Sequence, residues 1–392
     1  MKKTINILMS LFLFCTPLLK AETSEETLIS NMNSFAFSFY NSSSTEDCIF
    51  SPYSLFSCLT MAYVGAKADT RIEMQNALHL TLDNLELIQA TNAVKNSLYS
   101  PSLHIANSIW VQKKLTLKMN YTNALTSGWE IEARELDFYN TINSTNTINS
   151  WVDRETNGQI EKLFNPGDLD RDTKLVLTNA IYLKAQWQKP FSKANTKKNP
   201  FYKKAGEATQ VDMMNQTSVF PYFENEDLQL LVMPFKSKDN LALATFFLLP
   251  KGDLATLEGF LTGDSIQELL GATENAEVSV KIPRFKLKNR ILPKEILQKL
   301  GMGKAFAQGA NFSDITEETG LEITQIVHEA VFSCDEDGVI AAAATGISMG
   351  VTCIKPKPKI TFDFIADHPF LFGVVDLNSG LTLFLGKLAN PI

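Results

Sequence analysis

The chain has 392 residues, of which 45% are hydrophobic and 20% are charged, so it can bury a large core as one large domain or as two. A formal net charge of −7 argues against the basic footprint of a nucleic-acid-binding protein. Beyond residue 19 no apolar run approaches the roughly 18 residues of a membrane span, so we expect no membrane-embedded part in the mature protein.

The N-terminus has the layout of a secretory signal peptide, which we place at residues 1–21. Lys2 and Lys3 precede an apolar run over 5–19, and Ala21 offers a small residue for cleavage, although Leu19 is larger than usual at its position. We therefore expect a secreted or periplasmic protein, and the compact basic start is typical of bacterial signals. Residues 22–392 show no linker or internal repeat and are expected to form one domain.

Helices are predicted in the first part of the mature chain and strands in the last part. Ser51 followed by Pro52 is typical of a helix start, and the apolar stretch behind them runs to Gly65. Two further helices are expected at about 70–78 and 148–163. Alternating polar and apolar residues predict half-buried strands over 279–282 and 284–288, and two apolar runs separated by Leu-Asn-Ser-Gly predict a hairpin over 370–385. Helices before strands, without a repeated strand–helix unit, indicate an α+β fold.

Signals of enzyme chemistry are absent from the sequence, so we expect neither catalysis nor a metal or cofactor. There is no Gly-x-Ser-x-Gly elbow, His-Glu-x-x-His motif or phosphate-binding loop. The mature cysteines lack Cys-x-x-Cys spacing, which argues against a zinc site, and we expect buried thiols at all of them except Cys353. His328 lies in an apolar, strand-like run and is interpreted as a core histidine whose hydrogen bonds are satisfied.

The most informative segment is Glu-Asp-Gly-Val-Ile-Ala-Ala-Ala-Ala-Thr-Gly over residues 336–346. Alanine favours helix, so propensity alone predicts a short alanine-rich helix or a linker. Small side chains also suit an exposed loop that can later fit into a packed structure. Gly338 supplies conformational freedom before the alanines, and Lys-Pro-Lys-Pro at 355–358 argues against a helix continuing beyond that point.

Sequence blocks along the mature chain resemble the signatures of the serpin family. They are Phe-Ser-Pro-Tyr-Ser at 50–54 with Gly-Ala-Lys-Ala-Asp-Thr at 65–70, Asn-Ser-Trp-Val at 149–152 with Thr-Asn-Gly-Gln-Ile at 156–160, Thr-Asn-Ala-Ile-Tyr-Leu-Lys at 178–184 with Trp187 and Phe191, Phe-Ile-Ala-Asp-His-Pro-Phe-Leu-Phe at 364–372, and Gly-Lys-Leu-Ala-Asn-Pro at 386–391. Their order and extent identify the chain as similar to a serpin over essentially its whole mature length.

The resemblance implies a serpin fold with three β-sheets, eight or nine helices and an exposed reactive-centre loop at about 336–360. In this family a target serine protease attacks the loop as a substrate and forms an acyl-enzyme with it. The loop then inserts into the main sheet as an extra strand and distorts the trapped protease. It implies a monomer whose partner is a serine protease, with a cysteine protease as an alternative, and with no nucleic acid or membrane.

At the positions that match the hinge of the family's reactive loop, this sequence has mostly small residues. In an inserted strand they would alternate between two faces, and none is charged beyond Glu336, so insertion would bury no unpaired charge. Inhibitory members usually have threonine or serine where Val339 stands and often glutamate where Ile340 stands, so a non-inhibitory binding or carrier protein stays an alternative. The hinge residues are Glu336, Gly338, Val339, Ala341, Ala342, Ala343, Ala344 and Thr345.

The family's usual spacing places the reactive bond at Thr352–Cys353, sixteen positions after Glu336. Thr352 suits a protease with a small apolar pocket of the elastase type. Met349 is an alternative that would suit a chymotrypsin-like enzyme. Lys355 would suit a trypsin-like enzyme, but the proline that follows it generally resists such cleavage.

Five further residues match family positions around the opening of the main sheet. Ser51, Ser54, Asn179 and His328 align with a polar cluster beneath the place where the strands part, and Trp187 aligns with the tryptophan at the top of that sheet. Hydrogen bonds within the cluster would tune how readily the strands separate, because buried polar groups are costly when unpaired. Ordinary core packing is the alternative interpretation.

Overall fold

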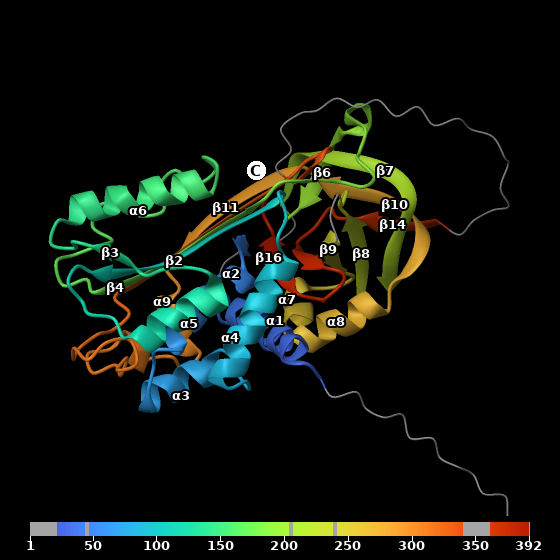
Figure 1. Cartoon of the computed structure of the whole chain (residues 1–392). Coiled ribbons are helices and arrows are strands. Elements are labelled where there is room, and N and C mark those ends of the chain that lie inside the picture. Colours follow the sequence, from blue (N-terminus) through green and yellow to red (C-terminus); the bar gives the residue numbers. More distant parts are fainter. Residues whose placement is uncertain (1–21, 44–46, 204–206, 238–240, 340–360, 392) are drawn as a thin grey trace, which may run out of the picture.

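The computed structural model describes residues 22–43, 47–203, 207–237, 241–339 and 361–391, and this part of the chain has the expected α+β fold (Figure 1). The predicted signal peptide and the loop residues from Ile340 to Ile360 lie outside the described residues. Within these ranges the nine α-helices are α1 (Ser24–Ser42), α2 (Pro52–Tyr63), α3 (Ala68–Ala77), α4 (Asn84–Ser97), α5 (Met119–Trp129), α6 (Thr141–Glu155), α7 (Leu254–Glu258), α8 (Gly263–Gly271) and α9 (Lys294–Lys299).

A seven-stranded sheet forms the long axis of the molecule. Its strand order is β3-β2-β4-β12-β13-β5, with β11 paired to the other edge of β12. Strands β4 and β12 are parallel neighbours although about 140 residues separate them in sequence. The strands are β2 (Leu103–Gln112), β3 (Arg134–Leu136), β4 (Leu175–Leu183), β5 (Ala185–Gln186), β11 (Phe285–Ile291), β12 (Gln325–Cys334) and β13 (Gly338–Val339).

A nine-stranded sheet follows the order β1-β16-β15-β9-β8-β7-β10-β14, with β6 paired to β7. Strand β7 pairs with β6 and β10 along most of its length and with β8 at its end, so it joins two halves into one hydrogen-bonded sheet. If the two halves of this nine-stranded sheet are counted separately, they and the seven-stranded sheet make the three sheets that the resemblance implies. The strands are β1 (Cys48–Phe50), β6 (Lys197–Tyr202), β7 (Ala208–Glu224), β8 (Leu228–Pro234), β9 (Leu243–Pro250), β10 (Glu274–Pro283), β14 (Thr361–Ile365), β15 (Phe370–Asp376) and β16 (Thr382–Leu388).

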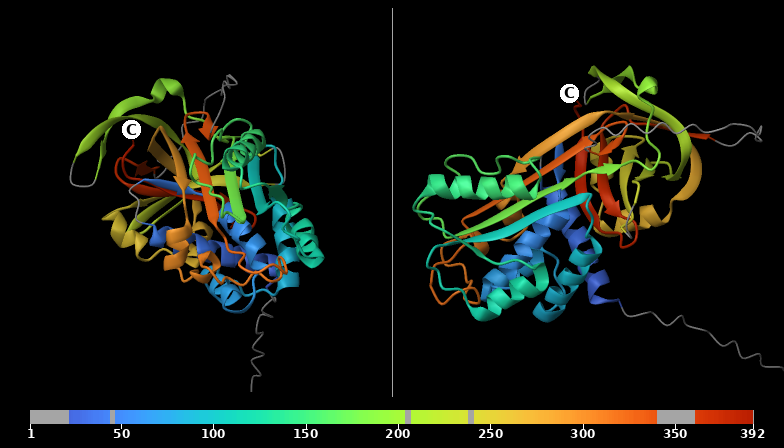
Figure 2. Two further views of the ribbon diagram at one scale, coloured as in Figure 1. Left: turned by 90° about the vertical axis from the view of Figure 1, so that its left-hand side faces the viewer. Right: turned by 45° about the horizontal axis from the view of Figure 1, so that its top comes forward.

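Both faces of the seven-stranded sheet are covered by helices (Figures 1 and 2). Strand β4 is buried at all nine positions, and its side chains alternate between two apolar clusters as the period of a strand requires. Leu177 and Ile181 belong to the main core on the side of α2, whereas Val176 and Ala180 belong to a smaller cluster beneath α6. Helix α6 is therefore the cover of one face.

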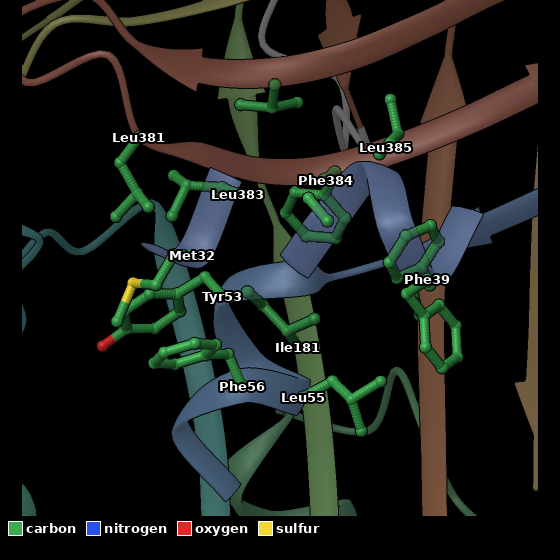
Figure 3. Close-up of a cluster of buried hydrophobic side chains, with 14 of the residues drawn as sticks. Met32, Phe39, Tyr53, Leu55, Phe56, Ile181, Leu381, Leu383, Phe384 and Leu385 are labelled. Carbon is green, nitrogen blue, oxygen red and sulfur yellow. The ribbon is translucent and has the colours of Figure 1, made fainter. Parts of the chain in front are cut away.

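The main core lies between the two sheets and the N-terminal helices. Figure 3 shows side chains of α1 and α2, among them Phe39 and Phe56, meeting Leu383 and Phe384 of β16 and Ile181 of β4. The start of α2 explains its position in this core. Ser51 Oγ accepts a hydrogen bond of 3.2 Å from the backbone N–H of Ser54, and Pro52 occupies the first helical turn, where a missing N–H costs nothing.

Most predicted elements are confirmed, and one helix was placed wrongly. The helix after Ser51, the consecutive strands β10 and β11, which lie in different sheets, and the β15–β16 hairpin all form. The helix expected at 148–163 is α6, which begins earlier because Asn140 caps it through a 3.2 Å bond from the N–H of Asn143. It ends at Glu155 because residues 157 and 158 both adopt positive φ, which stops an α-helix.

Within the described ranges, no helix combines the length and apolar character needed to cross a membrane. The predicted burial of the thiols is confirmed for Cys48, Cys58 and Cys334. Cys353 lies outside the described residues.

Candidate functional site

The candidate site is the seam between the parallel strands β4 and β12. The two strands pair directly from Val176↔Gln325 to Tyr182↔Val331. Beyond this point the seam holds a third strand, because β13 pairs antiparallel with the end of β12 on one side and with β5 on the other. The sheet is thus closed along most of the seam and already contains an extra strand at its top.

The extra strand consists of Gly338 and Val339, two of the predicted hinge residues. Val339 is fully buried and belongs to the main core. A Cβ atom on residue 338 would lie 2.0 Å from the carbonyl oxygen of Ala185, so the approach of β13 to β5 requires glycine. The predicted role of Gly338 as a special backbone position therefore has a steric cause, the closeness of the neighbouring strand.

A tight turn leads from β12 into β13. The backbone N–H of Asp335 donates to the carbonyl of Gly338 at 2.9 Å, and the Asp335 carboxylate accepts from the N–H groups of residues 337 and 338. Trp187, directly after β5, supports this turn, because its indole Nε1–H donates to the Asp335 carbonyl at 2.9 Å and its backbone N–H donates to the Asp337 carbonyl at 3.0 Å. Its ring is fully buried and stacks on Phe235 with centroids 4.7 Å apart.

Glu336 in the same turn is a buried carboxylate with partners from outside the hinge. Its side chain is only 4% exposed, accepts a 2.7 Å hydrogen bond from Thr196 Oγ1 and lies 3.6 Å from the guanidinium of Arg284. Arg284 is shared with Asp212, and Lys193 pairs with Asp337 at 3.0 Å. The start of the predicted reactive loop is therefore held by charge-assisted contacts as well as by backbone pairing.

A buried polar cluster lies beneath the seam and joins β4, β12 and α2. His328 of β12 faces Asn179 of β4 through Nδ1 and the amide oxygen, and His328 Nε2 accepts a 3.0 Å hydrogen bond from the N–H of Ser51. Asn179 donates to Ser54 Oγ, and all four side chains are fully buried. The structure thus brings together the four residues that the sequence placed here.

These observations on the seam can be set beside known proteins. A family model described as serpin (serine protease inhibitor) matches residues 30–391. The chain belongs to the serpin family. A serpin-like protein of Thermococcus kodakarensis is 35% identical over 381 residues, which cover 94% of this chain and 87% of that protein.

Two further proteins similar to this serpin have a named activity or a solved structure. The leukocyte elastase inhibitor of Bos taurus is 34% identical, with 87% of this chain and 92% of that protein covered. Serpin48 of the insect Tenebrio molitor, described as a highly specific serpin, is 29% identical with a TM-score of 0.82, covering 95% of this chain and all of that one. Serpins typically inhibit proteases rather than act as enzymes, and the family generally targets serine proteases.

The polar cluster of this serpin has two further members that the sequence did not predict, Asn107 of β2 and Ser57 of α2. Asn107 of β2 accepts from Ser54 Oγ at 3.1 Å and from the Asn179 amide at 2.6 Å, and it donates to Ser57 Oγ at 3.2 Å. Asn107 pairs directly with Asn179 in the ladder between β2 and β4. The adjacent polar residues Asn107 and Ser108, within the apolar run of β2 from Ile105 to Val111, were the available signal.

The hydrogen bonds of His328 define its state. Because Nε2 accepts from a backbone N–H, the proton of the neutral ring resides on Nδ1 and is donated to Asn179. Burial lowers the pKa of His328 from 6.5 to about 3, since a charged imidazolium would lose its hydration without gaining a carboxylate partner. The histidine is therefore neutral at physiological pH and acts as a hydrogen-bonding link across the seam.

A strap formed by residues 156–174 crosses the opposite face of the seam after α6. On the β2 and β4 side, α6 packs through Trp151, whose ring meets Trp110 edge-on at 5.5 Å. On the far side Arg290 of β11 forms an ion pair with Asp168 and donates to the Leu163 carbonyl at 2.6 Å. The strap and the helix α6 that precedes it are thus attached on both sides of the seam, so separation of β4 and β12 must strain or release one of these attachments.

The described part of the site contains backbone donors and acceptors rather than a reactive constellation. Among the described residues there is no group of His, Cys, Asp and Glu that could hold a metal ion. What the geometry offers is strand addition, in which an extended segment gains main-chain hydrogen bonds on both edges. The predicted residues Ala341 to Thr345 and the candidate bonds at Met349, Thr352, Cys353 and Lys355 lie outside the described residues.

Proposed function

We propose that this serpin is a suicide-substrate inhibitor of serine proteases that traps its target by inserting the cleaved reactive loop between β4 and β12. The single observation that carries this proposal is the position of Gly338 and Val339, which already pair between β12 and β5 at the top of the seam. A strand that continued from Val339 would run antiparallel to both neighbours. Insertion would then lengthen the existing strand β13, and no first pairing of the loop with the sheet would have to form.

The hydrogen-bond balance of insertion favours the expanded sheet. The direct ladder between β4 and β12 would be lost, and two antiparallel ladders would replace it. Residues 341–346 are alanine, threonine and glycine, so both faces of the new strand can be buried without an unpaired charge. Val339 faces the main core, as expected if odd-numbered hinge residues point inward.

The proposed reactive bond is Thr352–Cys353, and the proposed target is a secreted protease of the elastase or chymotrypsin class. A small residue before the bond suits a small apolar specificity pocket, and a relative of similar length is named for inhibition of leukocyte elastase. Met349 and Lys355 remain the alternatives for chymotrypsin-like and trypsin-like enzymes.

The test is incubation of mature protein with an elastase, a chymotrypsin and a trypsin, followed by denaturing gels and mass analysis of the released peptide. We expect a complex that survives denaturation and a C-terminal peptide that begins at Cys353. The same proteases with an inactivated catalytic serine serve as controls, because they cannot form the acyl bond. Cleavage at Thr352 without any complex would contradict inhibition while leaving the bond assignment intact.

Two substitutions at one hinge position separate insertion from cleavage. Because Val339 is already buried in β13, Val339→Glu places an unpaired carboxylate at the point from which insertion would extend. This costs several kcal/mol and should expel β13 from the sheet, so cleavage should continue while the complex disappears. Val339→Thr has nearly the same shape and should retain the complex. Equal complex formation by wild type and Val339→Glu would show that trapping does not require this strand.

The alternative is a non-inhibitory carrier, for which Val339 and Ile340 are the evidence, since inhibitory members usually have other residues there. The thermal unfolding of loop-cleaved protein distinguishes the two functions. An inhibitory serpin gains a large increase in melting temperature after cleavage because insertion relaxes a strained native state. An unchanged melting temperature, together with cleavage of the loop, would favour the carrier.

We also propose export by the N-terminal segment, with cleavage after Ala21. The lysines and the apolar run of residues 1–21 support it, and the described fold begins directly afterwards with Thr23 capping α1. Expression of the full chain in a Gram-negative host should yield periplasmic protein with Glu22 as its first residue. Recovery of the uncleaved chain from the cytoplasm would contradict export.

A further inference from the structure

A second feature of the molecule lies far from the seam in the fold, where α7 and α8 meet the ends of β7, β8 and β9 (Figure 1). These elements line a hollow of about 850 Å³, within the range of sites that hold drug-sized ligands. Its apolar lining consists of Phe223, Leu228, Pro250, Leu257, Phe260, Leu261, Leu269 and Ala272. Leu228 and Leu257 are buried parts of the core, so the floor of the hollow is rigid.

The charged lining of this hollow is predominantly negative, with four carboxylates and one cation. Glu226, Asp227 and Glu268 are exposed carboxylates that form no ion pair within the described part of the chain. Asp253 adds a fourth carboxylate, which caps α7 through a 3.1 Å bond from the N–H of Ala255. The cation in the lining, Lys251, is already paired at 3.2 Å with a glutamate outside the hollow. An apolar ligand with a positive charge would therefore find its complement here.

An exposed aromatic ring lines the same hollow as these carboxylates. Phe260, in the connection between α7 and α8, is 76% exposed, and its aromatic neighbour in the hollow is the half-buried Phe223. Exposure of a whole phenyl ring is unfavourable unless something covers it. The face of an aromatic ring also attracts an organic cation, most strongly when nearby carboxylates share the charge.

We propose that the hollow between α7, α8 and the β7–β9 ends is a binding site for an amphipathic organic cation, meaning an aromatic or alkyl body with an ammonium group. The body occupies the apolar floor, and the ammonium group lies between Phe260 and the carboxylates of Glu226, Asp227 and Glu268. The site is independent of protease inhibition, because none of its residues belongs to the seam, the hinge or the polar cluster.

Three probes with one ring system and different charges test the proposal. Naphthylmethyl-trimethylammonium, naphthalenemethanol and naphthalenesulfonate are titrated into the mature protein, and binding is followed by calorimetry and naphthalene fluorescence. At low salt we expect the cation to bind at least about tenfold more tightly than the sulfonate, with the alcohol between them. Added salt should narrow this difference because the carboxylates are exposed.

Matched variants locate the site and separate its two components. Glu226→Gln combined with Asp227→Asn and Glu268→Gln should remove the preference for the cation but preserve binding of the alcohol. Phe260→Ala should weaken the cation several-fold, and Ala272→Trp should fill the hollow and weaken all three probes. The control combines Glu132→Gln, Glu161→Gln and Glu295→Gln, which change the net charge equally at exposed positions outside the hollow.

Unchanged melting temperatures establish that the exposed substitutions leave the fold intact. Equal affinity for all three probes would show that only the apolar ring system is bound, without selection by charge, and would overturn the proposal. Loss of the charge preference in the control variant would show that overall charge, rather than this rim, selects the cation. Absence of binding by every probe would also overturn it.

Discussion

Two residues of β12 point to the same side of the sheet, yet their surroundings differ completely. Phe332 lies in an aromatic cluster that joins the two sheets, with its ring 4.8 Å from Phe372 of β15 and 5.8 Å from Phe285 of β11. His328, two pleat repeats earlier on the same face, lies in the polar cluster that links β12 to β4. The backbone of β12 is paired to both neighbours, but its side chains add ring packing toward β11 and β15 and polar hydrogen bonds toward β4.

The difference indicates which neighbours of β12 can separate from it. Interlocked rings have no alternative partners, so separating them exposes apolar surface to water. Hydrogen-bonding groups such as Asn179 and Ser54 can exchange partners with an incoming backbone, so the seam can open at a lower cost. We infer that β12 stays with β11 and β15 when β4 moves away.

The largest expected effect comes from breaking the aromatic side. Phe372→Ala leaves a cavity among three rings and should lower the free energy of unfolding by about 3–5 kcal/mol, measured by urea denaturation. Phe372→Leu should cost less because it fills more of the space. Neither variant should promote opening of the seam, so native gels should show a single monomeric band. Aggregated or loop-inserted forms in Phe372→Ala would contradict the proposed division of roles.

The next effect comes from breaking the polar side. Asn179→Ala removes the acceptor of His328 Nδ1–H and the donor to Ser54 and Asn107, and each buried group left unpaired costs about 1–3 kcal/mol. This variant should convert to loop-inserted or polymeric forms on mild heating. The comparison is made at a urea concentration where Phe372→Ala is equally destabilised. If both variants convert equally fast, general destabilisation explains the result and the polar cluster has no special role in opening.

Over a single pH unit, a smaller effect is expected from acidification. The pKa of His328 is lowered from 6.5 in the unfolded chain to about 3 in the folded protein, so the unfolded state binds more protons between these values. The stability contributed by this group is complete above pH 6.5 and is lost as pH falls, by about 1.4 kcal/mol per pH unit. Replacement by glutamine, His328→Gln, should remove this part of the slope. Identical slopes in the two proteins between pH 4 and 6 would contradict a neutral buried histidine.

The sequence predicted the parts of this comparison that depend on local patterns. The cap at Ser51, the β15–β16 hairpin and the strand around His328 follow from residue type and period. The gathering of Ser54, Asn179 and His328 came only from the resemblance to serpins. No local rule brings together side chains from an early helix and two distant strands.

Other parts of the site could not be predicted because they depend on contacts across the sheet. Asn107 takes its role from its ladder partner Asn179, which the sequence of β2 does not reveal. The burial of Glu336 depends on Thr196 and Arg284, which arrive from other elements. The end of α6 was misjudged because apolar residues such as Ile160 and Leu163 continue a helical pattern into the strap, where they pack on the sheet without being helical.

The smallest effect on stability, and the sharpest test of how the seam opens, comes from the strap. The pair between Asp168 and Arg290 is partly exposed, so Asp168→Asn should change the free energy of unfolding by about 1 kcal/mol or less. The strap bridges the two sides of the seam, and a looser attachment should therefore let β4 and β12 part more often. Uptake of a synthetic peptide that copies residues 339–350, followed on native gels, should be faster in Asp168→Asn than in wild type. The double variant Asp168→Arg with Arg290→Asp restores an ion pair of opposite polarity and should return the rate toward wild type. Because peptide uptake needs no protease, the result separates opening of the sheet from inhibition. An unchanged rate of uptake would show that the ion pair between Asp168 and Arg290 does not limit the separation of β4 and β12.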